Sequence, residues 1–412
     1  MRRIDKCIQL HFLLVIIIKN RLIWCQCRWK REYYHCRFFS KRLKKAEKTA
    51  LIQIIKEHAI KEDDDLYYLN PGICVELQFS SFQQYKLSNP VFIQFLYNID
   101  WKDCTLEKLV ATESTPITHA DKPLFPNTTI TKLDYILYLK EVSPYLLPFL
   151  ENRLLTTIRF PHGLFGESFY QKQCPDYAPS YVQTYKNDDI EYIICNNLDT
   201  LMWLGNQLAF EFHIPFETIY SNSMPSEIVF DLDPPSVEHF YMAIKAAKVL
   251  QQILERLHLL SFVKISGNKG IQVYLPLPEK TFTYEEVRLF TEFIANYMIA
   301  ENPELFTIER LKKNRKNRLY IDYIQHSEGK TIIAPYSIRG NKGGYVACPI
   351  EWDELTEDLH PRQFSMDVVL QRLQKGIHSF AGYFAAKEKQ PFRQVLDVLT
   401  NVQNTEGQKK SE

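Results

Sequence analysis

The stretch "IVFDLDPPS", Ile228 to Ser236, places two aspartates in an otherwise apolar run and ends that run with two prolines. Successive side chains of a β-strand point to opposite faces, so Asp231 and Asp233 share one face and lie about 7 Å apart along the chain. Two carboxylates in a poorly solvated site repel each other and need a positive partner. Hard oxygen ligands at this spacing suit Mg²⁺ or Mn²⁺, whereas a solvated pair at the end of an edge strand would need no partner.

The segment "KISGNKGIQVYLPL", Lys264 to Leu277, predicts two strands joined by a tight turn. The turn contains Ser266, Lys269 and two glycines, which let the backbone approach an anion closely while the lysine adds charge. A Walker-type loop would need a helix directly after the lysine, and none is predicted. The turn is therefore either a phosphate-binding cradle or a plain glycine hairpin.

A third aspartate, Asp322, lies in the largely apolar run "RLYIDYIQ". A two-metal site uses a further carboxylate of this kind, although a lone aspartate is more often solvated. Basic residues flank it in "RLKKNRKNR" (Arg310 to Arg318) and "KTIIAPYSIRG" (Lys330 to Gly340). Charge runs are usually solvated faces, but beside a metal carboxylate they can clamp phosphate groups. The candidates for that role are Arg315, Arg318, Lys330, Ser337 and Arg339.

Two further segments carry weaker signals. His213 lies in "AFEFHIPF", where a histidine is by itself more often a packed core residue than a ligand. The segment "RFPHGLFGESFYQKQCPDYAP", Arg159 to Pro179, interleaves basic side chains with aromatic rings. That mixture suits phosphate and base contacts of a nucleic acid, and it also suits an ordinary surface loop. Its candidates for nucleic-acid contact are Arg159, Phe169 and Lys172.

The chain has 412 residues, enough for two or three domains, and a net charge of +1. No global field therefore draws it to nucleic acid or membrane, and such binding must come from local patches. No apolar run approaches the roughly 20 residues of a membrane span. The 9 cysteines form no disulfide-like framework. We therefore expect a cytoplasmic protein without a membrane partner, with a signal anchor at Cys7 to Ile18 as the alternative.

Composition divides the chain into five expected parts. Residues 1–50 are an atypical, basic start; residues 51–110 contain a strand around "ICVELQF"; residues 111–130 are a proline-rich linker; residues 131–392 form the main domain; and residues 393–412 are a disordered polar tail. In the main domain, helices alternate with strands that meet in hairpins. This pattern predicts an α+β fold with mixed or antiparallel central sheets flanked by helices.

Four local predictions concern the main domain. The helix in "DYILYLKEVSPYLLPFL" should end near Ser143, because a proline follows. The double proline should end the strand after Asp233, with Ser236 capping the next helix. The strands "RLYIDYI" and "KTIIAPYSI" should form a second hairpin. Thr283 and Glu286 have the spacing of a capping box.

The motifs "RFPHGLFGESFYQKQCP", "EFHIPF", "VFDLDPP", "KISGNKGIQVYLPL", "YIDYIQ" and "TIIAPYSIRG" occur in the order and spacing of one family. The chain from about residue 130 to 390 resembles the polymerase domain of bacterial DNA ligase D, a primase-like polymerase of non-homologous end joining. The resemblance implies a nucleotidyltransferase that adds NTPs, and possibly dNTPs, to primer ends or gaps carrying a 5′-phosphate. It also implies two Mn²⁺ or Mg²⁺ ions per site, Ku and a separate ligase as partners, and action at the nucleoid of a bacterium.

The resemblance also assigns roles to residues. The positions that match the family's catalytic, metal-binding carboxylates are Asp231, Asp233 and Asp322. Positions that match residues handling the nucleotide's phosphates are His213, Ser266, Lys269 and Arg339, with Arg315 or Arg318 as a further basic contact. Lys172 matches a lysine in the family's region for the downstream 5′-phosphate.

The chain departs from the family pattern at Gln272, where many members have histidine. Glutamine can still donate a hydrogen bond to a phosphate, but it carries no positive charge. Residues 66–105, with "VELQF" and "LSNPVF", look similar to the end of a ligase oligonucleotide-binding domain, yet the adenylated-lysine motif K-x-D-G is absent. We therefore expect a truncated ligase D that does not seal nicks. The alternatives are a weak or inactive DNA-end-binding relic and another metal-dependent, nucleotide-using DxD transferase.

Overall fold

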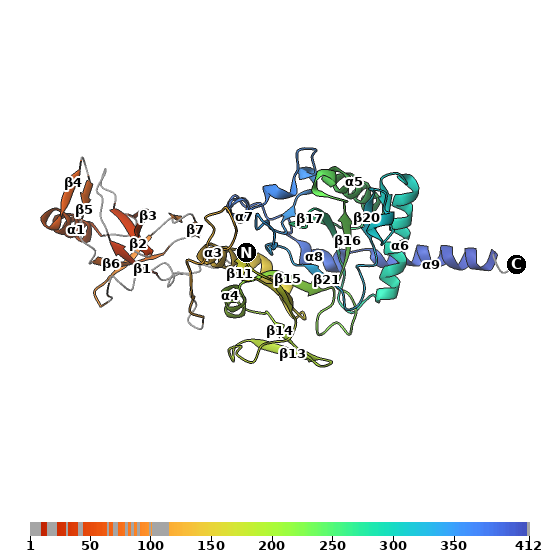
Figure 1. Cartoon of the computed structure of the whole chain (residues 1–412), viewed down its shortest axis with the longest axis horizontal. Helices are drawn as coiled ribbons and strands as arrows, with labels where there is room; N and C mark the ends of the chain where they lie inside the picture. The colour runs from red at the N-terminus through yellow and green to blue at the C-terminus, as the bar shows by residue number, and fades with distance from the viewer. Residues whose placement is uncertain are drawn as a thin grey trace. The chain divides into compact units, whose positions relative to one another are not determined.

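The structure is a computed structural model that describes residues 10–14, 23–29, 32–39, 44–63, 66–68, 73–78, 81–83, 86–88, 91–98, 100 and 115–409. The chain divides into two compact units, Met1–Lys122 and Pro123–Glu412. Both are built from strands and helices (Figure 1). In the part of the chain that the structure describes, no helix is long and apolar enough to cross a membrane.

The N-terminal unit contains an antiparallel sheet with the strand order β3-β2-β1-β6-β9. These strands are β1 Leu10–Leu14, β2 Ile23–Trp29, β3 Glu32–Phe39, β6 Ile73–Gln78 and β9 Val91–Leu96. The unit also contains helix α1 Lys45–His58 and the small pairs β4 Lys61–Asp63 with β5 Leu66–Tyr68, and β7 Ser81–Gln83 with β8 Lys86–Ser88. The strand expected around "ICVELQF" is β6. Because β1 pairs with β6, this one sheet contains strands from both sides of the boundary expected at residue 50.

The larger unit contains two central sheets, which confirms the expected α+β class. One has the order β19-β20-β16-β18-β17-β22, with β19 Phe306–Thr307, β20 Leu319–Asp322, β16 Glu227–Asp233, β18 Ile271–Pro276, β17 Phe262–Ile265 and β22 Pro349–Ile350. The other has the order β12-β10-β15-β21, with β12 Phe169–Gln171, β10 Thr156–Arg159, β15 Ala209–Pro215 and β21 Thr331–Ile333. The pair β19–β20 is parallel and the other pairs are antiparallel.

Helices flank these sheets (Figure 1). They are α3 Lys132–Leu150, α4 Leu198–Asn206, α5 Phe240–Arg256, α6 Tyr284–Glu301, α7 Met366–Gln374, α8 Tyr383–Ala386 and α9 Phe392–Lys409. Strand β11 Pro161–Leu164 and the hairpin of β13 Gln183–Asn187 with β14 Ile190–Ile194 complete the unit. Phe230 of β16 points away from the two aspartates and meets Phe290 of α6, with ring centroids 6.2 Å apart. The alternation in "IVFDLD" thus buries one face and leaves the other for Asp231 and Asp233.

Helix α3 does not end near Ser143, so that prediction is wrong. The helix continues through Pro144 and Pro148 to Leu150. A proline has no N–H to offer the carbonyl four residues earlier, which here belongs to Lys140. The Ser143 hydroxyl donates to the Lys140 carbonyl oxygen instead, at 2.8 Å. This substitute bond, together with the buried leucines and aromatic rings of the helix, explains why the proline is tolerated.

The second predicted hairpin is also wrong. Strand β20 pairs with β16 and β19, whereas β21 pairs with β15 in the other sheet. The segment "QHSEG" therefore connects two sheets rather than two neighbouring strands. By contrast, the hairpin around "GNKG" is confirmed, because β17 and β18 pair directly from Phe262–Tyr274 to Ile265–Ile271.

Strand and helix ends follow the local signals closely. Strand β16 ends at Asp233, directly before the double proline, as predicted. Ser236 precedes a 3-10 turn, Val237–His239, but its hydroxyl lies 2.9 Å from His239 Nδ1 and caps no backbone N–H. The capping box at α6 is confirmed: Thr283 Oγ1 accepts from Glu286 N, and Glu286 accepts from Thr283 N.

The tail expected to be disordered from residue 393 instead begins as helix α9. Its first residue, Phe392, is fully buried, and its ring lies 5.0 Å from that of Phe290. Leu396 is also buried, and Arg393 forms an ion pair with Glu286 at 2.8 Å. The polar composition concealed one apolar stripe, which fixes the start of the helix on the core.

A buried ion pair lies at the start of β16. Arg153 and Glu227 are 3% and 0% exposed, with 2.7 Å between Arg153 NH1 and Glu227 Oε1. Tyr383 donates to Glu227 Oε2 at 2.5 Å, and Arg153 also donates to Ser226 Oγ at 3.0 Å. Burial tends to raise the pKa of Glu227, but the charges of Arg153 and Lys387 and the hydrogen bonds from Tyr383 and Arg153 together bring it below its usual value.

We expect Arg153→Met to lower the free energy of unfolding by about 3–5 kcal/mol, because it leaves the Glu227 carboxylate buried and unpaired. Urea unfolding near neutral pH measures the effect. The control is Arg393→Met, which breaks an exposed pair and should cost no more than about 1 kcal/mol. Equal losses in the two variants would show that the Arg153 network does not hold the domain together.

A buried histidine should make stability depend on pH. His326 is fully buried, and its Nε2 lies 2.7 Å from the Glu227 carbonyl oxygen, to which it donates. Burial lowers the pKa of His326 to about 4, from an ordinary value of 6.5. Between these values the unfolded chain binds a proton that the folded chain excludes, so stability falls as the pH drops from about 6.5 to 4.

We expect this one group to contribute up to about 1.4 kcal/mol per pH unit within that window. The variant His326→Phe should therefore show a shallower loss of unfolding free energy on acidification than the wild type. The exposed His162 supplies a control, since His162→Gln should keep the wild-type slope. An unchanged slope in His326→Phe would mean that His326 is not kept neutral in the folded state.

Candidate nucleotide and metal site

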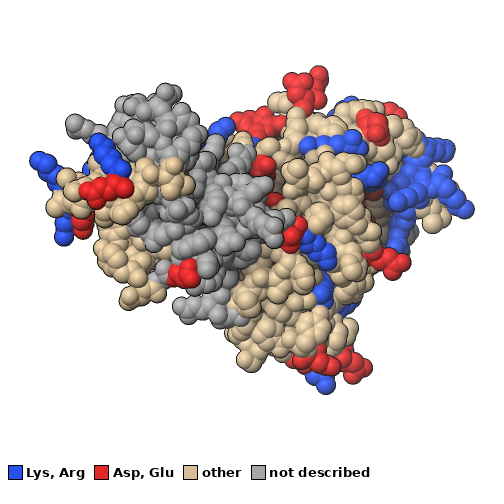
Figure 2. All heavy atoms as spheres, turned by 60° about the vertical axis from the view of Figure 1, so that its left-hand side comes forward, with Lys and Arg blue, Asp and Glu red and all other residues tan. Residues whose placement is uncertain are grey.

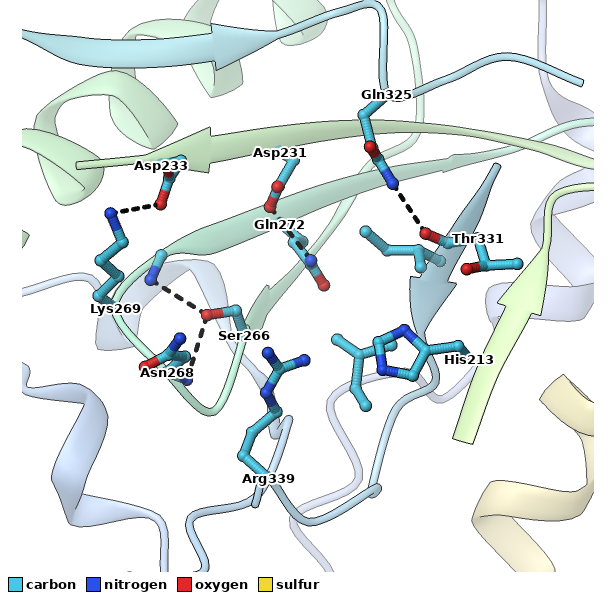
Figure 3. Close-up of a pocket in the computed structure, with 13 residues that line it drawn as sticks. His213, Asp231, Asp233, Ser266, Asn268, Lys269, Gln272, Gln325, Thr331 and Arg339 are labelled. Carbon is cyan, nitrogen blue, oxygen red and sulfur yellow. Dashed lines mark hydrogen bonds and ion pairs between the residues drawn. The ribbon is translucent and has the colours of Figure 1, made fainter. Parts of the chain in front are cut away.

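A cavity of about 220 Å³ opens where the two central sheets meet. Its walls come from strands β15, β16, β18 and β21, from the turn between β17 and β18, and from the connections on either side of β21 (Figure 3). In this view Arg339 and His213 lie across the cavity from Asp231 and Asp233. The lining residues are His213, Asp231, Asp233, Ser266, Asn268, Lys269, Gly270, Gln272, Gln325, Thr331, Ile332, Ile333 and Arg339.

Strand register brings four polar side chains into one row at the edge of the cavity. Asp231 lies opposite Gln272 on one side and opposite Asp322 on the other. Gln272 in turn lies opposite Lys264 of β17. The sequence predicted Asp231 and Asp322 as site residues 91 positions apart, and the pairing of β16 with β20 places them side by side.

The Asp231 carboxyl is held in an environment that opposes its charge. Burial, together with repulsion from the neighbouring carboxylates Asp233 and Asp322, raises its pKa to about 6, against a hydrogen bond from Gln272 that lowers it. That bond joins Gln272 Nε2 to Asp231 Oδ1 at 3.1 Å. A bound cation is the group that would relieve this repulsion.

The other two carboxylates have partners within the protein. Lys269 Nζ lies 3.0 Å from Asp233 Oδ1, and Arg315 NH1 lies 3.4 Å from Asp233 Oδ2. Asp322 Oδ1 accepts from the Tyr320 hydroxyl at 3.0 Å and from the backbone N–H of residue 325 at 2.9 Å. Lys269 and Arg315 therefore supply, at Asp233, the positive partner that the sequence analysis expected for the paired carboxylates.

Among the described residues, no group of three or more His, Cys, Asp or Glu side chains is arranged as a ready-made metal cluster. The donors nevertheless suit a hard divalent cation, because Asp231, Asp233 and Asp322 supply oxygen ligands from two paired strands. Asp231 and Asp322 could each provide a carboxylate oxygen as a ligand. Asp233 would first have to give up Lys269 or Arg315 to bind the cation. The site therefore fits such an ion once Asp233 is released.

The turn after β17 is held by its own serine. Ser266 Oγ accepts from the N–H of Gly270 at 3.0 Å and of Asn268 at 3.3 Å. Two backbone amides that could face an anion are thereby used inside the turn. Gly270 is required by its close approach to β16, since a Cβ there would lie 2.7 Å from the Leu232 carbonyl oxygen. Lys269 then leans toward Asp233 and donates to the Pro234 carbonyl oxygen at 2.6 Å.

A buried glutamate orients the two bases on the far side of the cavity. Glu211 Oε2 lies 2.9 Å from His213 Nε2 and 3.2 Å from Arg339 NH1, and Glu211 Oε1 accepts from the Gly340 N–H at 2.9 Å. Burial tends to raise the pKa of Glu211, but the hydrogen bond from His213 and the charge of Arg339 bring it below its usual value. His213 is thus a site residue rather than a packed core histidine.

Eight predicted residues do not line the cavity, among them Asp322 and Arg315, which contact or adjoin its carboxylates from the side. Ser337 is fully buried, with its hydroxyl against the backbone of Phe212, and Lys330 is exposed. Arg318 donates to the carbonyl oxygens of Arg315 and Pro303, so Arg315 is the one of the pair that reaches a site carboxylate. The remaining three, the candidates for DNA contact, are Arg159, Phe169 and Lys172.

These three candidates differ in exposure. Arg159 is 9% exposed, and its guanidinium donates to Gln171 Oε1, the Tyr177 hydroxyl and both oxygens of Gln207. It also lies over the Phe169 ring, 5.3 Å from the centroid. Phe169 is 44% exposed and Lys172 is exposed. Arg159 therefore supports the aromatic surface, and Phe169 and Lys172 are the side chains available to a partner.

Basic side chains also gather outside the cavity. On the face in Figure 2, Lys and Arg cluster at the right-hand edge, whereas Asp and Glu lie in several separate places. In the run before β20, the exposed basic residues are Arg310, Lys312, Lys313 and Lys316. The near-zero net charge of the chain thus conceals a local basic surface, which is the requirement for binding a phosphate backbone.

Sequence reasoning missed the polar lining residues Asn268, Gln325 and Thr331. It also missed Lys264 and Glu211, which do not line the cavity but bond to residues that do. Lys264 interrupts the apolar strand "FVKIS", and Glu211 stands two residues before His213, on the same face of β15. Both were visible as charges inside strands. Their roles depend on partners from other strands, which no local pattern identifies.

The fold and the cavity define the class: an α+β domain with strand carboxylates facing a lysine-bearing turn. A family model described as "LigD, primase-polymerase domain" matches residues 131–380, and the chain belongs to this family. A solved structure, the polymerase domain from Mycobacterium tuberculosis ligase D in complex with DNA, is similar with a TM-score of 0.61 and 29% sequence identity. That similarity covers 67% of this chain and 98% of the solved chain.

One curated relative is similar beyond the polymerase domain. The bifunctional non-homologous end joining protein LigD of Bacillus subtilis is 46% identical over 359 residues, which cover 86% of this chain and 58% of the relative. This share exceeds the residues from 131 onward, so the match includes part of the N-terminal unit. The multifunctional LigD of Mycolicibacterium smegmatis is 31% identical over 63% of this chain and 35% of its own length. The chain thus spans little more than half of the first relative and about a third of the second.

Proposed function

We propose that this chain is a metal-dependent nucleotidyltransferase that adds NTPs, and possibly dNTPs, to DNA primer ends or gaps during non-homologous end joining. The observation that carries the proposal is the cavity in which Asp231 and Asp233 face Lys269, Arg339 and His213. Carboxylates on one wall and phosphate-binding bases on the other are what a nucleoside triphosphate with its divalent cations requires. Membership of the LigD primase-polymerase family supports the same reaction.

The chain's own residues have separable tasks in this reaction. Asp231, Asp233 and Asp322 are the groups that would hold two divalent cations, Mn²⁺ or Mg²⁺. Such ions, when bound, lower the pKa of a primer 3′-hydroxyl and neutralise a triphosphate. Arg339 and Lys269 place fixed positive charge where negative charge grows on the phosphates. Ser266, whose oxygen is occupied by turn amides, can donate its hydroxyl hydrogen to a phosphate oxygen.

No protein nucleophile is needed, because the 3′-hydroxyl attacks the α-phosphorus in line and pyrophosphate leaves. Glu211 keeps His213 and Arg339 aimed at the cavity before the nucleotide arrives. When the site is loaded, Asp233 gives up its contacts with Lys269 and Arg315 and binds a divalent cation instead. The side chains of Lys269 and Arg315 are then available to the triphosphate. Before loading, Asp233 thus holds Lys269 and Arg315 near the place where the phosphates would bind.

The remaining parts of the proposal concern partners. Exposed Phe169 and Lys172 are placed to contact DNA by stacking and by charge, the lysine toward a downstream 5′-phosphate. The N-terminal unit, with its antiparallel sheet, would correspond to the end of a ligase oligonucleotide-binding domain. We further propose that Ku brings the DNA ends together and that a ligase seals them after nucleotide addition.

Primer extension tests the proposal. The substrate is a gapped duplex with a 5′-phosphate, supplied with Mn²⁺ and with NTPs and dNTPs in parallel reactions. We expect addition of one or a few nucleotides, and no sealed product.

One observation favours a second candidate, a DNA-end-binding relic without catalysis. Asp233 is already bound by Lys269 and Arg315, as it would be in a site that no longer binds metal. Binding of the gapped duplex with no nucleotide addition in Mn²⁺ would support the relic and overturn the polymerase.

A further inference from the structure

A lysine lies buried beside the cavity without lining it. Lys264 of β17 is fully buried, and its Nζ lies 2.6 Å from Gln272 Oε1 and 3.1 Å from the Ile333 carbonyl oxygen. Ile333 belongs to β21 of the other sheet, so the lysine joins the two sheets at the floor of the cavity. A buried amine is costly unless its hydrogens are used, and here two oxygens receive them.

The lysine decides which way the Gln272 amide points. Lys264 Nζ donates to the Gln272 amide oxygen and to the Ile333 carbonyl oxygen, so the amide oxygen of Gln272 faces Lys264. The amide nitrogen then faces Asp231, and it donates to Asp231 Oδ1 at 3.1 Å. The reverse orientation would set an oxygen against the carboxylate and an NH₂ group against the amine, with repulsion at both ends. A glutamine is suited to this bridge because one end accepts while the other donates.

We propose that Lys264 is a positioning residue that acts through Gln272 to fix Asp231 in the orientation that receives a divalent cation. The inference rests on the proposed function, because it concerns the same metal site. The amide holds Asp231 through Oδ1, and Asp231 lines the cavity. The bridge also gives a reason for glutamine at this position: its oxygen accepts from the buried amine of Lys264, and its nitrogen donates to the carboxylate.

The inference predicts how Mn²⁺ binding depends on the two residues. In metal-free protein titrated with Mn²⁺ and followed by electron paramagnetic resonance, Lys264→Met and Gln272→Leu should each weaken Mn²⁺ binding by about 10- to 100-fold, the worth of one hydrogen bond to a charged group. In the double variant the loss should equal that of Gln272→Leu alone, because Lys264 acts only through the amide.

A matched control separates orientation from packing. Lys387 is a second largely buried lysine, paired with Glu279 at 3.6 Å and absent from the cavity lining. Lys387→Met should leave Mn²⁺ binding unchanged, even if it lowers the melting temperature as Lys264→Met does.

The outcomes are distinct. Wild-type Mn²⁺ affinity in Lys264→Met, or losses that multiply in the double variant, would overturn the positioning role. A wild-type protein that binds Mn²⁺ with this dependence on Lys264 but extends no primer would contradict the polymerase and leave the positioning role intact. A wild-type protein that binds no Mn²⁺ would overturn both.

Discussion

The variant Asp231→Asn should lose nucleotide addition by about 1,000-fold or more, because it removes the central ligand of the proposed metal site and with it several kcal/mol of transition-state stabilisation. Asp231 lies opposite Asp322 in the sheet, two residues before Asp233 on β16, and accepts from Gln272. An asparagine of the same shape keeps one oxygen but removes the charge. The rate of primer extension under single-turnover conditions, with saturating Mn²⁺ and nucleotide, measures the loss.

The same substitution should not unfold the protein. Burial and two neighbouring carboxylates oppose the charge of Asp231, so removing that charge relieves repulsion in the metal-free state. We expect a melting temperature equal to or above that of the wild type. Asp358→Asn, an exposed acidic residue away from the cavity, should keep both rate and melting temperature. Wild-type extension by Asp231→Asn would refute its catalytic role.

The variant Arg339→Ala should lower kcat/KM for the nucleotide by about 100- to 1,000-fold, the effect of removing one preorganised charge from a phosphoryl-transfer site. Arg339 lies across the cavity from the aspartates, and Glu211 holds its guanidinium at 3.2 Å. Because the charge on the phosphates grows in the transition state, most of the loss should appear in kcat rather than in KM. Steady-state extension at varied nucleotide concentration separates the two.

Two controls accompany this variant. Lys342→Ala removes an exposed base from the same connection and should leave kcat/KM unchanged. Glu211→Gln keeps the shape of the residue that orients Arg339 but weakens its hold, and it should show an intermediate loss. A fall in DNA affinity with unchanged nucleotide kinetics in Arg339→Ala would instead assign Arg339 to the primer or template.

Strand periodicity and turn residues predicted much of the site from the sequence. The period of two in "IVFDLD" placed Asp231 and Asp233 on one face, and the glycines of "GNKG" located the hairpin that carries Lys269. The double proline located the end of β16. These are local effects, in which sterics within a few residues decide the conformation.

One failed prediction has a local cause, and the other failures depended on partners distant in the chain. The end of α3 was misplaced because the Ser143 hydroxyl replaces the hydrogen bond that Pro144 cannot make. The hairpin of β20 and β21 was wrong because tertiary pairing with β16 and β15 competes with the nearest neighbour in sequence. The bridge from Lys264 needs the register of three strands at once, and neither propensity nor motif spacing contains that information.

In the proposed function, an exchange of partners at Asp233 would lead from the observed structure to a site loaded with cation and nucleotide. In the metal-free protein Asp233 neutralises Lys269 and Arg315, which keeps two like-charged groups together in a confined space. If Asp233 binds a metal ion, Lys269 and Arg315 lose their anionic partner. A triphosphate would replace that partner. Loading of cation and nucleotide should therefore be cooperative, each lowering the cost of binding the other.

The most direct test of the account is anomalous X-ray scattering from Mn²⁺ in crystals of the wild-type protein soaked with Mn²⁺ and a non-hydrolysable nucleoside triphosphate. The account predicts manganese peaks coordinated by Asp231, Asp233 and Asp322, with Lys269 and Arg339 on the phosphates and the Lys269–Asp233 contact broken. Manganese and nucleotide bound elsewhere, or a cavity that stays closed by the Lys269–Asp233 and Arg315–Asp233 ion pairs at saturating Mn²⁺ and nucleotide, would contradict it.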